Sequence, residues 1–267
     1  MQNLDSSSNQ LPFLSIVTVV AFETDRLART LKSVEGLSGN IEHIFIVPKV
    51  DDVSTKLILD YSNNVSFPVI TSNDSGIGIY PAMNIGIQAS SGRYCYFLNA
   101  GDEIYDQTQF ESNLVSVFLA EPEWAILGCC LPWNNSYYTY PDMAKRYLKQ
   151  EKNAYVSHQS IVVKRELIDN LNGFDISLKV AADTLMTMQL TNISTPLTLD
   201  GIAIKVERGN TVTASNRLSR FETMRAVIKL QHNKSKFIAI LNILKKELGF
   251  LFKKITRFIA KRVQESQ

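Results

Sequence analysis

The sequence predicts an α/β protein in which helices flank a mainly parallel central sheet. Two β-branched apolar runs, at residues 15–20 and 41–47, lie on either side of a segment with helical spacing. Strand-like and helix-like segments then keep alternating as far as residue 100, and no repeat or low-complexity linker interrupts them. Such alternation is typical of parallel strands joined by crossover helices.

The first βαβ unit consists of SIVTVV, the helix RLARTLKSVEGL and IEHIFIV. Leu27, Leu31 and Val34 recur at helical spacing in that helix, and Gly36 can end it. The pattern continues with three further elements, which are the strand SFPVIT (66–71), the helix YPAMNIGIQAS (80–90) and the strand YCYFLNA (94–100).

The second half of the sheet region is expected to hold shorter elements. QFESNLVSVFLAE predicts a helix, and AILGCCL predicts one buried strand. The remaining expected elements are the strand HQSIVV (158–163), the short helix KRELIDNL, the helix AADTLMTMQL (181–190) and a last strand pair in TPLTLDGIAIKV.

The composition of the 267 residues, with 45% hydrophobic and 20% charged side chains, indicates a soluble globular protein. The polar start MQNLDSSSNQ lacks the basic and apolar regions of an export signal, so we expect a cytoplasmic location. Cys95, Cys129 and Cys130 lie in apolar segments, which predicts reduced core thiols.

The strand YCYFLNA ends on Asn99-Ala-Gly-Asp102. Ligands of open α/β sheets bind beyond the carboxyl ends of the strands, and hard divalent cations prefer oxygen donors. Asp102 is therefore a candidate ligand for a cation bound to a diphosphate, with Asn99 beside it. An ordinary turn is the alternative, because Asn, Gly and Asp are common turn residues.

Several ordered blocks resemble the family 2 glycosyltransferases of the GT-A fold, especially bacterial members that build surface polysaccharides. The blocks are SIVTVVAFETDRLARTLKSV, DSGIGIYPAMNIGIQASSGRYCYFLNAGDEIY, HQSIVVKRELI and NGFDISLKVAADTLMTMQL. The resemblance implies a Rossmann-like GT-A domain and transfer of a sugar from a nucleotide diphosphate sugar to an acceptor hydroxyl, with inversion.

The resemblance also assigns roles to the two main candidate residues. Asp102 matches the family's metal-binding motif and would hold Mn²⁺ or Mg²⁺ on the donor diphosphate, although only one carboxylate of that motif is present. Asp183 matches the family's base and would accept the proton of the acceptor hydroxyl. The alternative for Asp183 is a carboxylate that only stabilises a helix N-terminus.

Further substrate-binding candidates follow from the same comparison. Asp74 falls where relatives place an acidic residue facing the donor, and Tyr80 and Asn84 open the next helix. His158 begins the shared HQS segment and is a candidate contact to diphosphate or acceptor, although a lone histidine at a strand start is more often structural.

The first two strand ends depart from the family pattern. Glu23 retains an acidic residue after the first strand, but Val47-Pro48 stands where relatives carry the aspartate that reads the nucleobase. Asp51 or Asp52 would have to replace it, and we select Asp52. This departure leaves an alternative open, in which the chain is a weak or inactive relative acting as an assembly partner.

The C-terminal region is strongly basic although the whole chain carries a net charge of only +2. Residues 215–267 contain 13 Lys/Arg and 3 Asp/Glu, which leaves 15 and 23 in the remainder, so the two parts carry +10 and −8. We therefore expect a catalytic domain at 1–214 and a basic helical region at 215–267.

The tail has one apolar stripe and an opposite basic face on an expected helix over 235–262. The stripe comprises Phe237, Leu241, Leu244, Leu248, Leu251, Ile255 and Phe258. Such a helix can lie on an anionic membrane, which predicts a location peripheral to the inner face of the cell membrane. A homodimer seam or packing on the enzyme's own core is the alternative.

The expected partners are therefore a nucleotide diphosphate sugar donor, a saccharide or lipid-linked acceptor, and the membrane. Nucleic acid is not expected, because no zinc spacing, aromatic RNA-binding signature or recognition-helix motif accompanies the basic charge.

Overall fold

A computed structural model describes residues 11–22, 24–74, 76, 78–133, 136–139, 156–207 and 217–230. The chain divides into two compact units, Met1–Thr211 and Val212–Gln267, and each is described by itself. The boundary expected after residue 214 remains a prediction.

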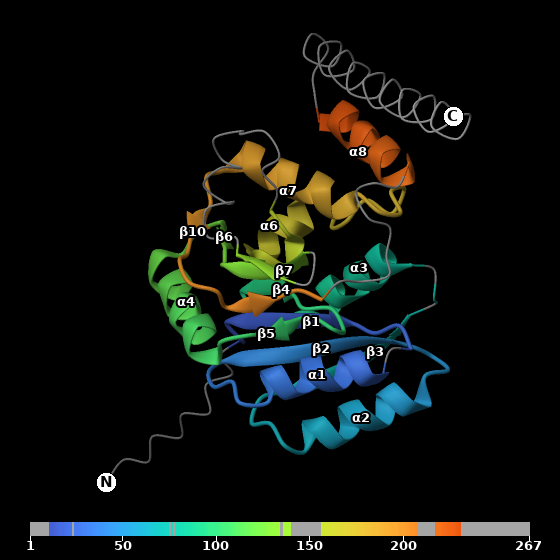
Figure 1. Cartoon of the computed structure of the whole chain (residues 1–267), viewed down its shortest axis with the longest axis vertical. Helices are drawn as coiled ribbons and strands as arrows, with labels where there is room; N and C mark the ends of the chain where they lie inside the picture. The colour runs from blue at the N-terminus through green and yellow to red at the C-terminus, as the bar shows by residue number, and fades with distance from the viewer. Residues whose placement is uncertain are drawn as a thin grey trace, which may run out of the picture. The chain divides into compact units, whose positions relative to one another are not determined.

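The first unit is built on a seven-stranded sheet (Figure 1). Its strands are parallel except for β9, which runs antiparallel to both of its neighbours. The prediction of a mainly parallel sheet is thus confirmed. In spatial order the strands are β10 (Leu197–Thr198), β6 (Trp124–Ile126), β9 (Ile161–Lys164), β4 (Tyr94–Phe97), β1 (Leu14–Val19), β2 (Ile41–Pro48) and β3 (Val69–Asp74).

Helices cover both faces of this sheet. In Figure 1, α1 and α2 lie on one side of it, and α3, α6 and α7 lie on the other. Because the chain steps from β1 to β3 in one direction and then returns to β4, right-handed crossovers require this change of side. The helices are α1 (Thr24–Val34), α2 (Asp52–Ser62), α3 (Ile79–Ala89), α4 (Gln107–Ala120), α6 (Arg165–Asn170) and α7 (Ala182–Ile193).

The larger core lies under α1, α2 and α4. Leu27, Leu31 and Val34 are buried in it, as their spacing predicts, together with Phe110 of α4. On the other face α3 approaches the sheet closely at Gly86, where a side-chain carbon would collide with Val17 of β1. The helical spacing of Leu27, Leu31 and Val34 therefore identified the face of α1 that packs on the sheet.

The segment AILGCCL is not one strand, contrary to our prediction. It forms β6 and β7 (Cys129–Trp133), which belong to different sheets. The chain leaves the first sheet at Gly128, where the backbone passes so close to Gly201 that no side chain fits. Apolar patterning cannot reveal this change of sheet, because both strands are buried. The second sheet has the order β5 (Glu103–Ile104), β11 (Ile204–Lys205), β7 and β8 (Ser136–Thr139).

Two other expectations need correction. HQSIVV begins with a 3-10 turn, η1 (His158–Ser160), and only then enters β9. The segment TPLTLDGIAIKV supplies β10 and β11, but these pair with β6 and with β5 and β7 rather than with each other. Helix α2 was not among the predicted elements.

In the second unit, the described residues form α8 (Arg217–Leu230). The amphipathic helix expected over 235–262 lies outside the described residues. Within the described part of the chain, no helix combines the length and the apolar character that crossing a bilayer requires.

Candidate active site at the carboxyl end of the sheet

The loop from Asn99 to Asp102 is held at the carboxyl end of β4 by a buried threonine of α1. Thr30 Oγ1 accepts the N–H of Gly101 at 2.9 Å and donates to the carbonyl oxygen of Asp102 at 2.8 Å. Gly101 has φ +105, a conformation that favours glycine. The turn interpretation therefore describes the backbone correctly, and the turn places the Asp102 side chain in the interior, 4% exposed.

The Asp102 carboxylate is buried with few compensating donors. Its Oδ1 accepts the main-chain N–H of Glu207 at 3.0 Å. Burial raises the pKa of Asp102 to about 6, although the Glu207 N–H, His158 and the Gln159 side chain favour the ionised form. A carboxylate of this kind gains from a bound cation.

Asp183 lies in the first turn of α7 and is approached from three directions. The Tyr80 hydroxyl donates to Oδ1 at 3.0 Å, the Thr184 N–H donates to the same oxygen at 2.7 Å, and His158 Nδ1 lies 3.2 Å from Oδ2. The Asp183 and His158 side chains are each 16% exposed.

These neighbours determine the charge state of Asp183. Burial alone raises its pKa, but His158, the Thr184 N–H and the Tyr80 hydroxyl outweigh burial, so the pKa of Asp183 lies below its ordinary value. The carboxylate is therefore ionised at neutral pH and can accept a proton.

The short turn η1 connects the two carboxylates. His158 contacts Asp183, and its other ring nitrogen, Nε2, lies 3.2 Å from Asn99 Nδ2 at the end of β4. The Gln159 side chain, next along the turn, and His158 both favour the ionised form of Asp102 and so act to lower its pKa. Asp102 and Asp183 therefore flank one turn at the carboxyl end of the sheet, and Asn99, Tyr80 and His158 lie with them.

The other predicted site residues are less closely grouped. Asp74 ends β3, is buried, and accepts the Gly76 N–H at 3.1 Å, while Asp52 begins α2 and is exposed. Asn84 Nδ2 donates to the carbonyl oxygen of Phe174 at 2.9 Å, and Asn84 Oδ1 accepts the Phe174 N–H at 2.8 Å. These two bonds give the Asn84 side chain a structural role. Glu23 lies outside the described residues.

The structure places three further residues near these strand ends: Asp51, which the sequence offered as the alternative to Asp52, and Phe22 and Glu207, which the sequence did not single out. Asp51 is 5% exposed and caps α2 by accepting the Ser54 N–H at 3.1 Å, and its buried Oδ2 has no hydrogen-bond partner in the described part of the chain. Phe22 follows β1 with φ 56 and is 62% exposed. The main-chain N–H of Glu207 donates to Asp102 Oδ1. The capping pattern Asp-x-x-Ser could have identified Asp51, but no local signal identifies Glu207.

The donor atoms near Asp102 suit a hard cation. Asn99 Oδ1 is buried and has no hydrogen-bond partner among the described residues, and amide and carboxylate oxygens are the ligands that Mg²⁺ and Mn²⁺ prefer. Among the described residues, no group of three or more acidic, histidine or cysteine side chains forms a complete metal site. A diphosphate would have to supply the remaining oxygens.

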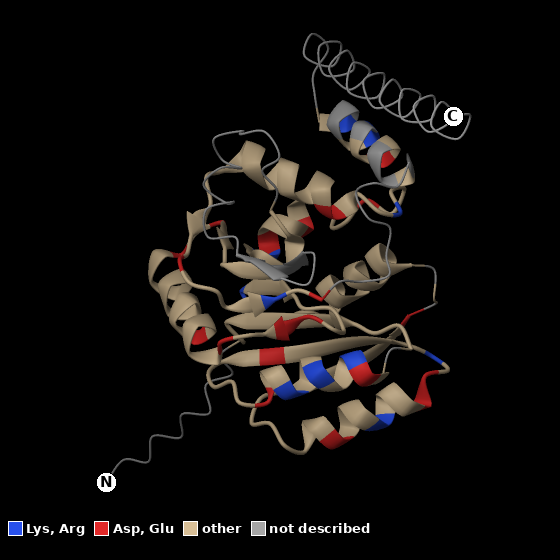
Figure 2. Cartoon of the chain, in the orientation of Figure 1, with Lys and Arg blue, Asp and Glu red and all other residues tan. Residues whose placement is uncertain are grey.

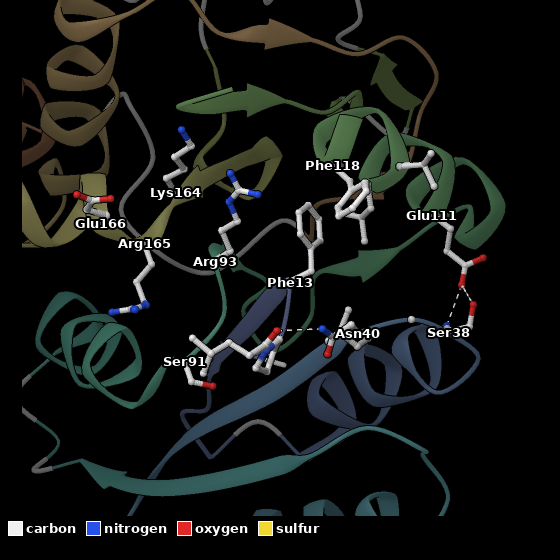
Figure 3. Close-up of a pocket in the computed structure, with 16 residues that line it drawn as sticks. Phe13, Ser38, Asn40, Ser91, Arg93, Glu111, Phe118, Lys164, Arg165 and Glu166 are labelled. Carbon is white, nitrogen blue, oxygen red and sulfur yellow. Dashed lines mark hydrogen bonds between the residues drawn. The ribbon is translucent and has the colours of Figure 1, made fainter. Parts of the chain in front are cut away.

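A pocket of about 970 Å³ lies at the opposite, amino end of the strands. It is lined by apolar side chains such as Phe13 and Phe118, with Arg93 and Lys164 nearby (Figure 3). The predicted catalytic and binding residues are not among its lining residues. We place the candidate active site at the carboxyl end of the strands, because Asp102 and Asp183 both lie there.

The fold is the GT-A-like fold of glycosyltransferases. Staphylococcus aureus TarS, residues 1–349, solved in complex with UDP-GlcNAc, superposes with a TM-score of 0.68 at 13% identity, covering 89% of this chain and 73% of that one. The mannosyltransferase PcManGT from Pyrobaculum calidifontis, in complex with GDP-Man and Mn²⁺, gives 0.61 at 12% identity, covering 88% and 69%.

Curated sequences also resemble this chain. A PGL/p-HBAD biosynthesis glycosyltransferase from Mycobacterium bovis is 24% identical over 183 residues, covering 65% of this chain. An uncharacterized glycosyltransferase from Mycobacterium tuberculosis is 25% identical over 196 residues, covering 70% of this chain and 72% of its own length. The chain spans 64% of the length of the first of these relatives. No protein-family model matches the sequence.

Proposed function

We propose that this chain is an inverting glycosyltransferase that moves a sugar from a nucleotide diphosphate sugar to an acceptor hydroxyl. The observation that carries the proposal is the position of His158, whose Nδ1 lies 3.2 Å from Asp183 and whose Nε2 lies 3.2 Å from Asn99 in the loop that carries Asp102. The fold shared with glycosyltransferases solved with UDP-GlcNAc and GDP-Man supports it.

Asp102, with Asn99 beside it, would hold Mn²⁺ or Mg²⁺ on the donor diphosphate. Such an ion neutralises the negative charge that collects on the departing nucleoside diphosphate. The buried Asp102 carboxylate and the unpartnered Asn99 Oδ1 support this assignment.

Asp183 would take the proton from the acceptor hydroxyl. As the acceptor oxygen bonds to the anomeric carbon, the bond from that carbon to the diphosphate breaks, and the diphosphate leaves with the bonding electrons. Attack from the face opposite the leaving group inverts the anomeric centre. Tyr80 and His158 would keep Asp183 ionised and fix its orientation.

Recognition of the nucleotide would involve the ends of β1 and β2. Phe22 presents an exposed aromatic ring from a backbone conformation that is rare for residues with a side chain, and strain of about 1–3 kcal/mol tends to occur at functional sites. Its ring suits stacking on a nucleobase. Asp74 at the end of β3 would contribute an acidic group, and so would Glu23, whose position lies outside the described residues.

The cellular role we infer is sugar transfer in bacterial surface polysaccharide biosynthesis, on a saccharide or lipid-linked acceptor. The basic residues of 215–267 would bring the enzyme to the cytoplasmic face of the membrane. The similarity to a PGL/p-HBAD biosynthesis glycosyltransferase supports a role as a sugar-transferring enzyme of a biosynthetic pathway.

Calorimetric titration tests the proposal. The intact chain with Mn²⁺ should bind one of UDP, GDP, CDP, ADP or dTDP. Asp102→Asn should lose this binding, whereas Asp183→Asn should retain it and lose transfer from the corresponding sugar nucleotide. Absence of heat with every nucleotide would overturn the proposal and favour a noncatalytic assembly partner.

A further inference from the structure

The main chain of Glu207 holds one of the two carboxylates of the candidate site. Its N–H donates to Asp102 Oδ1 at 3.0 Å, between residues far apart in the sequence. A carboxylate with one oxygen fixed in this way keeps its other oxygen in a constant direction. Residues that orient a metal ligand often matter nearly as much as the ligand itself.

The side chain of Glu207 is anchored to α1 by two arginines. Arg29 Nη2 lies 2.6 Å from Oε1, and Arg26 Nε lies 3.2 Å from Oε2. Figure 2 shows basic residues along α1 and an acidic residue on β5, the strand that follows Asp102. Since guanidinium groups are planar and permanently charged, this double contact defines where Glu207 lies.

The loop that carries Asp102 has a glycine, Gly101, where the Glu207 carboxylate packs against it. A side-chain carbon on Gly101 would collide with Glu207 Oε2, so the Glu207 carboxylate packs directly against the backbone of the loop. The strand before Glu207 is also fixed, because the main chain of β11 pairs with that of β5.

We propose that Glu207 is a positioning residue for Asp102. Its side chain, held by Arg26 and Arg29, keeps its N–H directed at Asp102 Oδ1, and this N–H sets the orientation in which Asp102 meets a divalent cation. The role of Asp102 in this inference rests on the proposed function, whereas the anchoring of the N–H does not.

Hydrogen exchange tests the anchor without any ligand. In the intact chain, Glu207→Ala and the double variant Arg26→Ala/Arg29→Ala should each speed exchange of the residue 207 amide by about tenfold or more. The matched control is Glu103→Ala, which removes a carboxylate from the same ion-pair network but leaves Glu207 and Gly101 in contact. Unchanged protection at residue 207 in Glu207→Ala would overturn the inference.

Binding of Mn²⁺ in the presence of the nucleotide that binds supplies the second measurement. Glu207→Ala should weaken the apparent Mn²⁺ affinity by about tenfold, as expected for a residue that orients a ligand, with an unchanged melting temperature. Glu207→Gln, which keeps a side-chain oxygen that can accept hydrogen bonds from the arginines, should restore most of the Mn²⁺ affinity. Glu103→Ala should bind Mn²⁺ with the affinity of the wild type. Equal Mn²⁺ affinity of Glu207→Ala and wild type would also overturn the inference. If the wild type binds no nucleotide with Mn²⁺, the proposed function fails, while the exchange result still decides whether Glu207 is the anchor.

Discussion

At the scale of single residues, Asp102 weakens the fold at the pH where it would bind a cation. Its pKa is raised by burial to about 6 from an ordinary value of 3.8. The folded chain therefore holds this proton more tightly than the unfolded chain, and the stability that this provides is lost as the pH rises from 3.8 through about 6.

Asp102→Asn should consequently stabilise the protein at pH 7.5, by roughly 1–3 kcal/mol, while an amide oxygen remains for the Glu207 N–H. Urea unfolding of both proteins at pH 7.5 and pH 5 measures this effect, and the gain should shrink at the lower pH. If Asp102→Asn were less stable than the wild type at pH 7.5, the burial of the Asp102 charge would not be the main effect of this side chain on the free energy of unfolding.

The pair of His158 and Asp183 makes a prediction about pH dependence. His158 is the main neighbour that lowers the pKa of Asp183, so His158→Ala should raise that pKa and shift the acid limb of kcat/KM toward higher pH. Tyr80→Phe, which removes a weaker contribution, should shift the same limb less. An acid limb that stays in place in His158→Ala would argue against Asp183 as the base.

The sequence could propose Asp102 because it follows a buried strand, and Asp183 because its segment resembles a glycosyltransferase block. It could not identify Glu207, because its contact with Asp102 depends on the pairing of β11 with β5. Likewise, the choice of Asp52 over Asp51 needed burial, which the two adjacent aspartates do not reveal in sequence.

At the scale of elements, many strand and helix positions followed from periodicity, but α2, which buries Ile58 and Tyr61 in the same core as α1, was missed. The predictions failed at AILGCCL and TPLTLDGIAIKV, where the chain passes from one sheet to another within a few residues. Hydrophobic patterning reports burial but does not report the sheet to which a buried strand belongs.

The packing of α3 on the sheet gives an element-scale prediction. Gly86→Ala should destabilise the first unit by about 1–3 kcal/mol, because the added methyl group meets the buried Val17 side chain and outweighs alanine's better helix propensity. Chemical denaturation measures this change. The double variant Gly86→Ala/Val17→Ala should lose less unfolding free energy than the two single variants together, because the smaller residue 17 leaves room for the methyl group. A loss equal to the sum of the two single losses would rule out the steric cause.

At the scale of the whole molecule, charge separates the two parts of the chain. The part that contains the sheet is acidic and the last 53 residues are basic, at −8 and +10. The membrane role of the tail remains a prediction, since its apolar stripe lies outside the described residues.

Liposome flotation tests that role. The intact chain should float with vesicles that contain anionic lipid and should be released by high salt, because the attraction is electrostatic. A truncated chain ending at residue 214 should stay at the bottom, and neutral vesicles provide the control. Equal flotation of both chains would remove the membrane hypothesis.

The close crossing of Gly128 and Gly201 has a consequence for reading loss-of-function variants. Any side chain at Gly128 would push apart the segments that lead into β7 and β11, and β11 leads directly to Glu207 and so to Asp102. A substitution there would disturb the proposed cation site by displacing the backbone. Such a variant would be expected to lose donor binding although every residue proposed to contact the donor is unchanged.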